Sequence, residues 1–263
     1  MRWTRDSSRS TRCRSSRSRR IDSCSVGCVM SVWRMGRPRV ADSLAVILLA
    51  AGSSSRMQGV DKLWSDLDGA PVVAHSLRTL AAFEGLSTLV IVAPGARHDA
   101  LRGLVDDIGA EVRCVEGGAR RQDSVAAGIA AAPDADWYLV HDAARPLVSA
   151  ELCARLLEAA RASGAAIPVL PVVDTVKRVD AEGRVLETLD RATLRAAQTP
   201  QAFAGSLLRR AHAEVRGEVT DDASMVEALG APVATVPGES ANLKVTTAGD
   251  LQLVRMLLAG SRS

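Results

Sequence analysis

From residue 44 onward the chain alternates short apolar runs with longer amphipathic segments, and this alternation restricts its possible folds more than any other feature. Short runs rich in β-branched residues are typical of buried strands, whereas longer segments with apolar residues at helical spacing are typical of helices. A strand, helix, strand, helix order requires right-handed crossovers and gives a mostly parallel sheet between helical layers. The sequence therefore predicts an α/β fold.

The predicted elements follow one another with short connections. We expect buried strands at 44–50, 87–94, 111–117 and 233–238, with another beginning at Trp137 in the segment 137–146. We expect helices at 71–83, 96–109, 121–132, 149–164, 205–215, 221–229 and 247–260. Ser149 and Gly164 have the residue types that cap a helix at its start and end, and Gly109 is expected to end the second helix.

Residues 172–191 break this rhythm. They alternate between apolar and polar along two runs that are joined by the turn DAEG, which predicts a β-hairpin arm inserted into the α/β domain. A two-stranded arm is marginally stable by itself. A second copy of the chain is the simplest surface to stabilise it, so we expect a homodimer through this arm.

The first 40 residues differ from the rest in composition. They contain 11 arginines and two aspartates, a balance of +9, so residues 41–263 carry −6 of the total net charge of +3. A Ser/Arg-rich segment with few apolar residues cannot offset the entropy of ordering. We therefore expect residues 1–40 to be a disordered basic extension and 41–263 to form the folded domain.

Three interpretations of this extension remain open. It has the composition of a plastid transit peptide. It could be an arm that binds nucleic acid, or it could result from an assigned start upstream of a true beginning at Met30 or Met35. Without a transit peptide, the expected location is the cytoplasm.

Other patterns exclude several classes of protein. No apolar stretch approaches the roughly 20 residues of a membrane span, so no membrane partner is expected. The five Cys and four His do not have zinc-site spacing, and neither a GxSxG nor an HExxH motif is present. The segment DAD (134–136) precedes a predicted strand and is interpreted as a loop. The cysteine usage suggests a reducing compartment.

The turn after the first strand is a candidate phosphate site. AAGSSSRM follows directly on the apolar run 44–50, where backbone N–H groups of a turn with small side chains can converge on anionic oxygens. Arg56 and Lys62 add fixed positive charge, which transfer of a nucleotidyl group needs on the attacked phosphoryl and the leaving pyrophosphate. A plain polar loop would show the same glycine and serines, so this stretch alone does not distinguish a phosphate-binding turn from an ordinary loop.

Two further turns lie where an α/β sheet binds ligands. EGGARRQDSV (116–125) enters a helix through two glycines and could contact a base or a ribose, although an ordinary capped helix start explains it equally well. In VHDAARP (140–146), Asp142 stands at the end of a buried strand and Arg145 follows three residues later. Asp142 is suited to a ribose or a magnesium ion, while an Asp–Arg pair at a solvated edge is the structural alternative.

Taken in order, these motifs resemble the 2-C-methyl-D-erythritol 4-phosphate cytidylyltransferases of the non-mevalonate isoprenoid pathway. The resemblance covers residues 44–258 and is carried by LLAAGSSSRM, GGARRQDSV, VHDAARPLV, DTVKR, LDRATLRAAQTPQAF, TDDASMVEALG and NLKVTT. It implies a Rossmann-like nucleotide-diphospho-sugar transferase fold whose β-arm reaches across a homodimer. It also implies transfer of CMP from CTP to 2-C-methyl-D-erythritol 4-phosphate, with Mg²⁺ and release of pyrophosphate.

The resemblance also implies roles for residues of this chain. Charge at the reacting phosphorus and the leaving group would be stabilised by Arg56 and Lys62, with Lys244 as a further catalytic group. The nucleotide would be held by Ala50, Ala51, Gly52, Gly118, Arg121, Ser124, Asp142 and Ala143. The methylerythritol phosphate would contact Arg145 and Lys244, together with Thr175 and Arg191 from the partner's arm. Which residues hold the metal stays open.

The first loop departs from the family pattern. Ser54 stands in place of a glycine and Asp61 in place of a proline, and the loop is also similar to that of the molybdopterin nucleotidyltransferases. Another nucleotidyltransferase of this fold is thus the alternative enzyme. From a different class, a nucleic-acid-binding module would depend on the Arg-rich extension. Deleting residues 1–35 distinguishes an enzyme from a nucleic-acid-binding module, because only the module would lose its function. Since the folded part is acidic, we expect no nucleic-acid partner.

Overall fold

The computed structural model describes residues 42–52, 61–105 and 108–260. These belong to one compact unit that spans Val40–Ser263. The expected disorder of residues 1–40, the catalytic role of Arg56 and the departure at Ser54 all concern positions outside the described residues.

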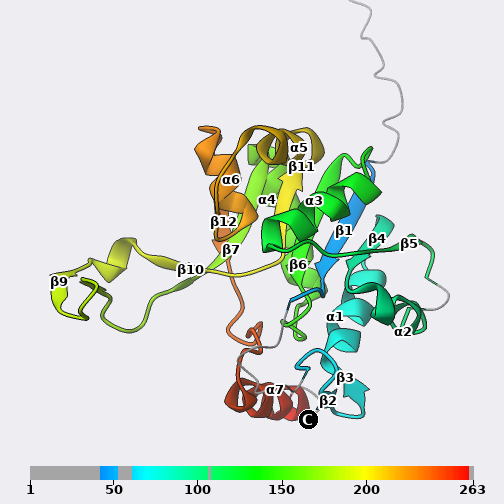
Figure 1. Ribbon diagram of the computed structural model, residues 1–263, viewed down its shortest axis with the longest axis horizontal. Helices are drawn as coiled ribbons and strands as arrows, with labels where there is room; N and C mark the ends of the chain where they lie inside the picture. The colour runs from blue at the N-terminus through cyan, green and yellow to red at the C-terminus, as the bar shows by residue number, and fades with distance from the viewer. Residues whose placement is uncertain (1–41, 53–60, 106–107, 261–263) are drawn as a thin grey trace, which may run out of the picture. The chain divides into compact units, whose positions relative to one another are not determined.

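An eight-stranded mixed sheet forms the centre of this unit (Figure 1). Its order is β10-β7-β11-β6-β1-β4-β5, and β12 pairs with β7. The strands are β1 Leu44–Leu49, β4 Leu86–Val92, β5 Glu111–Val115, β6 Trp137–Asp142, β7 Ala165–Pro171, β10 Arg195–Ala197, β11 Gln201–Ala204 and β12 Ala234–Pro237. The pairs β6-β1, β1-β4, β4-β5 and β7-β12 are parallel, whereas β11 runs antiparallel to β6 and β7 and β10 antiparallel to β7.

Helices cover both faces of the sheet. They are α1 Val72–Ala81, α2 His98–Arg102, α3 Arg121–Ala131, α4 Ala150–Ser163, α5 Gly205–Glu214, α6 Asp222–Ala228 and α7 Ala248–Gly260. The apolar residues of α1, α2 and α4 share one buried cluster, and those of α3, α5 and α6 share the other. The strand β1 contributes to both, because Leu44, Val46 and Leu48 point to the first cluster and Ala45 and Ile47 to the second.

The fold confirms the predicted α/β class and most of its elements. The helix 149–164 agrees closely: Ser149 accepts a hydrogen bond from the N–H of Leu152, and Gly164 ends the helix with a φ of 90°. The helix expected at 96–109 is wrong in length, since α2 ends at Arg102 after a 3-10 turn over Gly95–Arg97. A strand at 201–204 was not expected, and β11 and β10 make the sheet mixed at that side.

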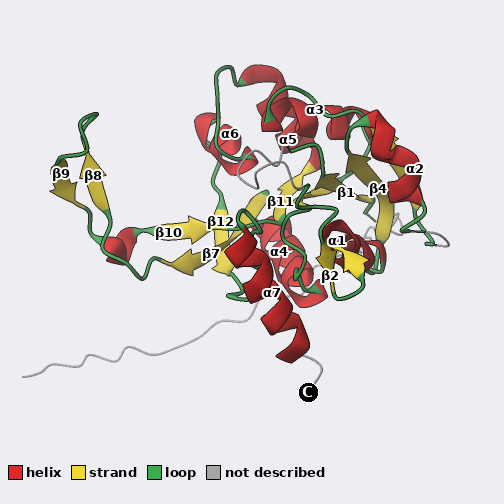
Figure 2. Ribbon diagram, turned by 60° about the horizontal axis from the view of Figure 1, so that its bottom comes forward, coloured by secondary structure: helices red, strands yellow, loops and turns green. Residues whose placement is uncertain are grey.

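The predicted hairpin arm is present but its strands are shorter than expected. β8 (Lys177–Val179) pairs antiparallel with β9 (Val185–Thr188) and lies apart from the main sheet (Figure 2). The Asp180 carboxylate closes the turn by accepting from the N–H of Arg184 at 2.8 Å, and Gly183 has a φ of 81°. The arm exposes apolar side chains, namely Val173, Val179, Val185 and Leu186.

A small third core joins the C-terminal helix to the segment before α1. Leu251 and Val254 of α7 pack with Val245 and with Leu67 of the short hairpin formed by β2 (Asp66–Leu67) and β3 (Ala70–Pro71). This packing includes Leu67, which follows Lys62, and Leu243 and Val245, which flank Lys244. Among the described residues, no helix combines the length and the apolar character that crossing a membrane requires.

Candidate active site

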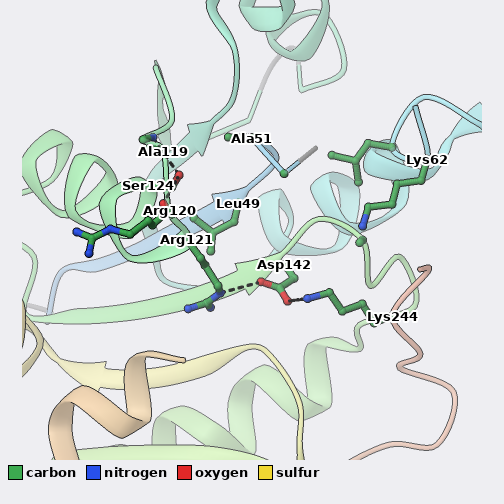
Figure 3. A pocket seen from close by; sticks show the side chains of 13 residues that line it. Leu49, Ala51, Lys62, Ala119, Arg120, Arg121, Ser124, Asp142 and Lys244 are labelled. Carbon is green, nitrogen blue, oxygen red and sulfur yellow. Dashed lines mark hydrogen bonds and ion pairs between the residues drawn. The ribbon is translucent and has the colours of Figure 1, made fainter. Parts of the chain in front are cut away.

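A cavity of about 460 Å³ lies at the carboxyl ends of β1 and β6, where ligands bind in open α/β sheets (Figure 3). Its size is within the range of pockets for small ligands. Lysine and arginine side chains outnumber its single carboxylate. The lining residues are Leu49, Ala51, Gly52, Lys62, Leu63, Gly118, Ala119, Arg120, Arg121, Ser124, Asp142, Ala144 and Lys244.

The end of β1 supplies a wall of small residues. The N–H of Ala50 donates to the carbonyl of Val92 at 2.8 Å, so Ala50 continues the sheet and is buried rather than exposed to the cavity. Ala51 and Gly52, two of the predicted nucleotide-binding residues, line the cavity. Lys62 also lines it, on the opposite side from Arg120 and Arg121 in Figure 3.

Two glycines in the turn before α3 stand where any side chain would clash with a neighbouring residue. A Cβ on Gly117 would lie 2.3 Å from the Cβ of Ala51, and one on Gly118 would lie 2.2 Å from the Cβ of Asp123. The N–H of Gly118 donates to Ser124 Oγ at 3.1 Å. The Ser124 hydroxyl is therefore used to hold the turn, and it is the backbone of this turn that borders the cavity.

Asp142 stands at the centre of the charged groups. Its Oδ2 accepts from Lys244 Nζ at 2.7 Å and its Oδ1 accepts from Arg121 Nε at 3.4 Å. Figure 3 shows the two cations reaching Asp142 from opposite sides. Burial alone would raise the pKa of the Asp142 carboxyl, but Arg121 and Lys244 together hold it well below its usual range. Asp142 is thus ionised at neutral pH.

A second carboxylate lies behind Arg121 and was not expected from the sequence. Asp222, the first residue of α6, is almost fully buried, and its Oδ2 accepts from Arg121 Nη1 at 2.7 Å. Its Oδ1 pairs with His212 Nε2 of α5 at 3.3 Å. The stretch TDDASM in this region pointed to a helix start, but no feature of the sequence linked it to Arg121, which lies 101 positions earlier.

A buried histidine supports the strand end that carries Asp142. The N–H of Asp142 donates to Thr199 Oγ1 at 3.1 Å, and the same oxygen is 3.2 Å from His141 Nδ1. His141 Nε2 lies 3.1 Å from the carbonyl of Arg145, which can only accept, so Nε2 carries the hydrogen and Nδ1 accepts from Thr199. Burial lowers the pKa of His141 to about 4 and keeps the ring neutral.

Two predicted residues of this turn do not reach the cavity. Ala143 is fully buried, and its N–H donates to the carbonyl of Leu49 at 3.0 Å. Arg145 turns toward the loop before Lys244, where Nη1 donates to the carbonyl of Asn242 at 2.8 Å. Ala144 lines the cavity between them.

The predicted residues of the arm lie outside this cavity. Thr175 and Arg191 are exposed, and the Arg191 guanidinium donates to the carbonyl of Val173 within the arm. Neither is among the residues that line the cavity. Within one chain, the structure therefore brings together the candidate nucleotide residues and Lys244, but not the two arm residues.

The resulting site can stabilise negative charge, and its described lining residues include neither histidine nor cysteine. The hydroxyl of its one serine, Ser124, is engaged by Gly118 and by the carbonyl of Arg120. Fixed cations and backbone amides in a partly enclosed cavity act on charge that develops in a transition state. Among the described residues, no group of three or more His, Cys, Asp or Glu is placed to hold a metal ion. These features suit a reaction between phosphorylated substrates in which positioning and electrostatics supply the catalysis.

Comparison with known sequences gives a consistent result. The family model described as 2-C-methyl-D-erythritol 4-phosphate cytidylyltransferase, IspD, matches residues 44–260. A protein of that description from Synechococcus is 42% identical over 219 residues, which are 81% of this chain and 98% of that protein. A bifunctional IspD/IspF enzyme from Anaeromyxobacter dehalogenans is 47% identical over 219 residues, which are 80% of this chain. The chain spans only 56% of the length of that bifunctional relative.

Solved structures agree with the sequence comparison. The structure described as 4-diphosphocytidyl-2C-methyl-D-erythritol synthase from Anaerococcus prevotii has a TM-score of 0.74 and 28% identity, and the match covers 83% of this chain and 99% of that one. The structure described as 2-C-methyl-D-erythritol 4-phosphate cytidylyltransferase from Thermus thermophilus has a TM-score of 0.67 and 38% identity, covering 81% and 98%.

Proposed function

Because this chain belongs to the 2-C-methyl-D-erythritol 4-phosphate cytidylyltransferase family, we propose that it transfers CMP from CTP to 2-C-methyl-D-erythritol 4-phosphate. The products are 4-diphosphocytidyl-2-C-methyl-D-erythritol and pyrophosphate. The observation that carries this proposal is the cavity at the carboxyl ends of β1 and β6, into which Lys62, Arg121 and Lys244 bring positive charge around Asp142. We assign the activity to residues 41–263.

In the proposed reaction an ionised phosphate oxygen of the sugar phosphate attacks the α-phosphorus of CTP, and the bond to the pyrophosphate oxygen breaks. The attacking oxygen carries no proton that must be removed, so no general base is required. Ala51 and Gly52 would bind the triphosphate through backbone amides, and the turn at Gly118 would border the nucleoside. Lys62, with Arg56, would stabilise the charge on the attacked phosphoryl group and the leaving group.

The sugar phosphate would bind on the Lys244 side of the cavity. Lys244 is held by Asp142 at 2.7 Å, which keeps its ammonium group at the wall of the cavity. We propose that Thr175 and Arg191 of a second copy complete this side, because in one chain both lie on the exposed arm. The exposed apolar residues of the arm, which include Val179 and Leu186, support its burial in a homodimer.

The family is consistent with a divalent metal ion, and we propose Mg²⁺. Mg²⁺ is usually bound through one or two carboxylates together with substrate phosphates and water, rather than by an all-protein cage. Asp142 is the one carboxylate in the described cavity lining, so the residues present fit an ion that enters with the triphosphate and is held on the protein side by Asp142. When bound, such an ion would neutralise charge on the phosphate oxygens.

The test is a substrate panel. The protein is incubated with each of the four nucleoside triphosphates and 2-C-methyl-D-erythritol 4-phosphate in the presence of Mg²⁺, and pyrophosphate release is measured. We expect release with CTP only, and only when the sugar phosphate is present. Release with a different nucleotide, or with CTP and a different acceptor alone, would favour another nucleotidyltransferase of the same fold.

A further inference from the structure

Arg121 is held by two carboxylates, and the two contacts are unequal. Its Nη1 is 2.7 Å from Asp222 Oδ2, whereas its Nε is 3.4 Å from Asp142 Oδ1. Asp142 in turn is 2.7 Å from Lys244. The short contacts therefore pair Arg121 with Asp222 and Lys244 with Asp142, while a longer contact joins the two pairs.

Asp222 does not line the cavity and cannot touch a ligand there. It is 1% exposed, and each of its two oxygens already has a partner, because Oδ1 pairs with His212 Nε2 at 3.3 Å. A carboxylate oxygen can only accept, so the hydrogen of that bond is on Nε2. The carboxylate is thus held by His212 of α5 and by its place at the start of α6, and it lies outside the lining of the cavity.

Burying such a carboxylate is costly. Replacing a buried ion pair by packed apolar residues is often neutral or stabilising, so a buried pair is weak evidence of a role in stability. Its geometric effect here is definite. With Nη1 held by Asp222 at 2.7 Å, the guanidinium meets Asp142 through Nε at the longer distance of 3.4 Å, while Asp142 keeps its 2.7 Å contact with Lys244.

We propose that Asp222 is a positioning residue for nucleotide binding. It holds the Arg121 guanidinium at the cavity wall and leaves Asp142 to Lys244. The Arg121 Nη2 group is buried and makes no hydrogen bond among the described residues, so the protein leaves one donor of this guanidinium unused. This inference rests on the proposed function, because it assumes that the nucleotide occupies the side of the cavity that Arg121 lines.

The experiment is a double-mutant cycle on nucleotide binding. The dissociation constant for CTP is measured by calorimetry, without the sugar phosphate, for the wild-type protein, Asp222→Asn, Arg121→Met and the double variant. Asp222→Asn keeps the shape of the side chain but removes its charge. We expect the dissociation constant of Asp222→Asn for CTP to be about tenfold higher than that of the wild-type protein, as for loss of one charge-assisted hydrogen bond. In turnover, KM for CTP should rise in proportion while kcat changes less than about threefold.

The cycle distinguishes positioning from a general structural role. If Asp222 acts through Arg121, Asp222→Asn should change the dissociation constant less than about twofold when Arg121→Met is already present. Glu111→Gln is the matched control, because it removes the ion pair with Arg113 on β5 without touching the cavity, and CTP binding should not change. If Arg121→Met does not fold, Arg121→Lys replaces it in the cycle.

The outcomes separate the inference from the proposed function. The same tenfold loss in both Arg121 backgrounds, or no loss in Asp222→Asn, overturns the inference while CTP turnover by the wild-type protein still supports the function. CTP binding that shows the expected coupling, without turnover of the sugar phosphate, supports the inference and overturns the function. A wild-type protein that does not bind CTP overturns both.

Discussion

The carboxylate of Asp142 determines how charge is arranged in the cavity. It pairs with both Lys244 and Arg121, and Arg121 also pairs with Asp222. Opposite charges alternate along this series, so each group is held by its neighbours in the absence of ligand. A preorganised set of this kind needs little rearrangement when a triphosphate arrives, which is the condition under which fixed charges contribute most to catalysis.

Removing the ammonium group of Lys62 tests the phosphate side of the cavity. We expect Lys62→Ala to lower kcat by about a hundredfold or more, as loss of a group that stabilises transition-state charge does. The measurement is pyrophosphate release at saturating CTP and sugar phosphate. Arg78→Ala, which removes an exposed cation of α1, is the control and should leave kcat unchanged. Normal turnover by Lys62→Ala would show that the first loop has been assigned wrongly.

The buried ring of His141 predicts a pH dependence of stability. Burial lowers its pKa from 6.5 to about 4, so between these values the unfolded chain binds a proton that the folded chain does not. The free energy of unfolding should therefore fall as the pH falls from about 6.5 to 4, by roughly 3 kcal/mol from this group. Protonation would also remove the Nδ1 acceptor that Thr199 uses.

Urea unfolding of the wild-type protein and of His141→Asn, at several pH values without nucleotide or metal, measures this contribution. The nearby charges of Asp142, Arg145 and Lys244 are present in both proteins, so the difference between the two curves isolates the histidine. We expect the variant to be less stable at pH 7 but to lose less stability on acidification. If the free energy of unfolding fell equally with pH in both proteins, the buried ring of His141 would not be the cause of the loss.

At the residue scale, the sequence predicted the side chains that lie beside recognisable turns. Asp142 ends a strand, and Gly118 and Arg121 lie at the start of a helix, so the rule for parallel sheets places them together. Asp222 could not be found in this way, because its contact with Arg121 joins residues that are 101 positions apart in the chain and does not depend on a local pattern. The substrate contact of Arg145 stays a prediction: its position in the turn was clear, but the direction of its long side chain, toward the carbonyl of Asn242, could not be inferred from the sequence.

At the element scale, local patterns succeeded where one element has its own signals. The helix α4 has Ser149 at its start and Gly164 at its end, and both were predicted to within a residue. The strand β11 has only four residues, and its pairing with β6 and β7 depends on contacts distant in sequence. The helix predicted over 96–109 contains Gly103 and Gly109, and glycine inside a helix is unfavourable, which agrees with the end of α2 at Arg102.

The start of α4 offers a test of stability that is separate from the site. Ser149 Oγ accepts from the N–H of Leu152 at 3.0 Å and donates to Glu239 at 2.8 Å. We expect Ser149→Ala to lower the free energy of unfolding by about 1–2 kcal/mol, measured by urea denaturation. Ser206→Ala, at an exposed position in the first turn of α5, should change it little. A KM for CTP altered by Ser149→Ala would mean that α4 and the cavity are coupled.

At the scale of the whole molecule, the arm is the element whose role a single chain does not explain. Its two strands pair only with each other in the described structure, and large apolar side chains such as Val185 and Leu186 are exposed on them. Thr175 and Arg191 lie on the same segment, away from the cavity that they are proposed to serve. A second copy of the chain would account both for the exposed surface and for the proposed substrate contacts of Thr175 and Arg191.

Mixing two inactive variants tests whether the arm acts across a dimer. In a heterodimer of Lys62→Ala and Arg191→Ala subunits, one site combines the intact cavity of the Arg191→Ala subunit with the intact arm of the Lys62→Ala subunit. If the arm serves the partner's cavity, random mixing makes about half of the dimers mixed, each with one complete site. We therefore expect about one quarter of wild-type activity, measured as pyrophosphate release after unfolding and refolding the two variants together. If each arm serves its own cavity, no dimer contains a complete site, and the mixture should be only as active as the average of its two components.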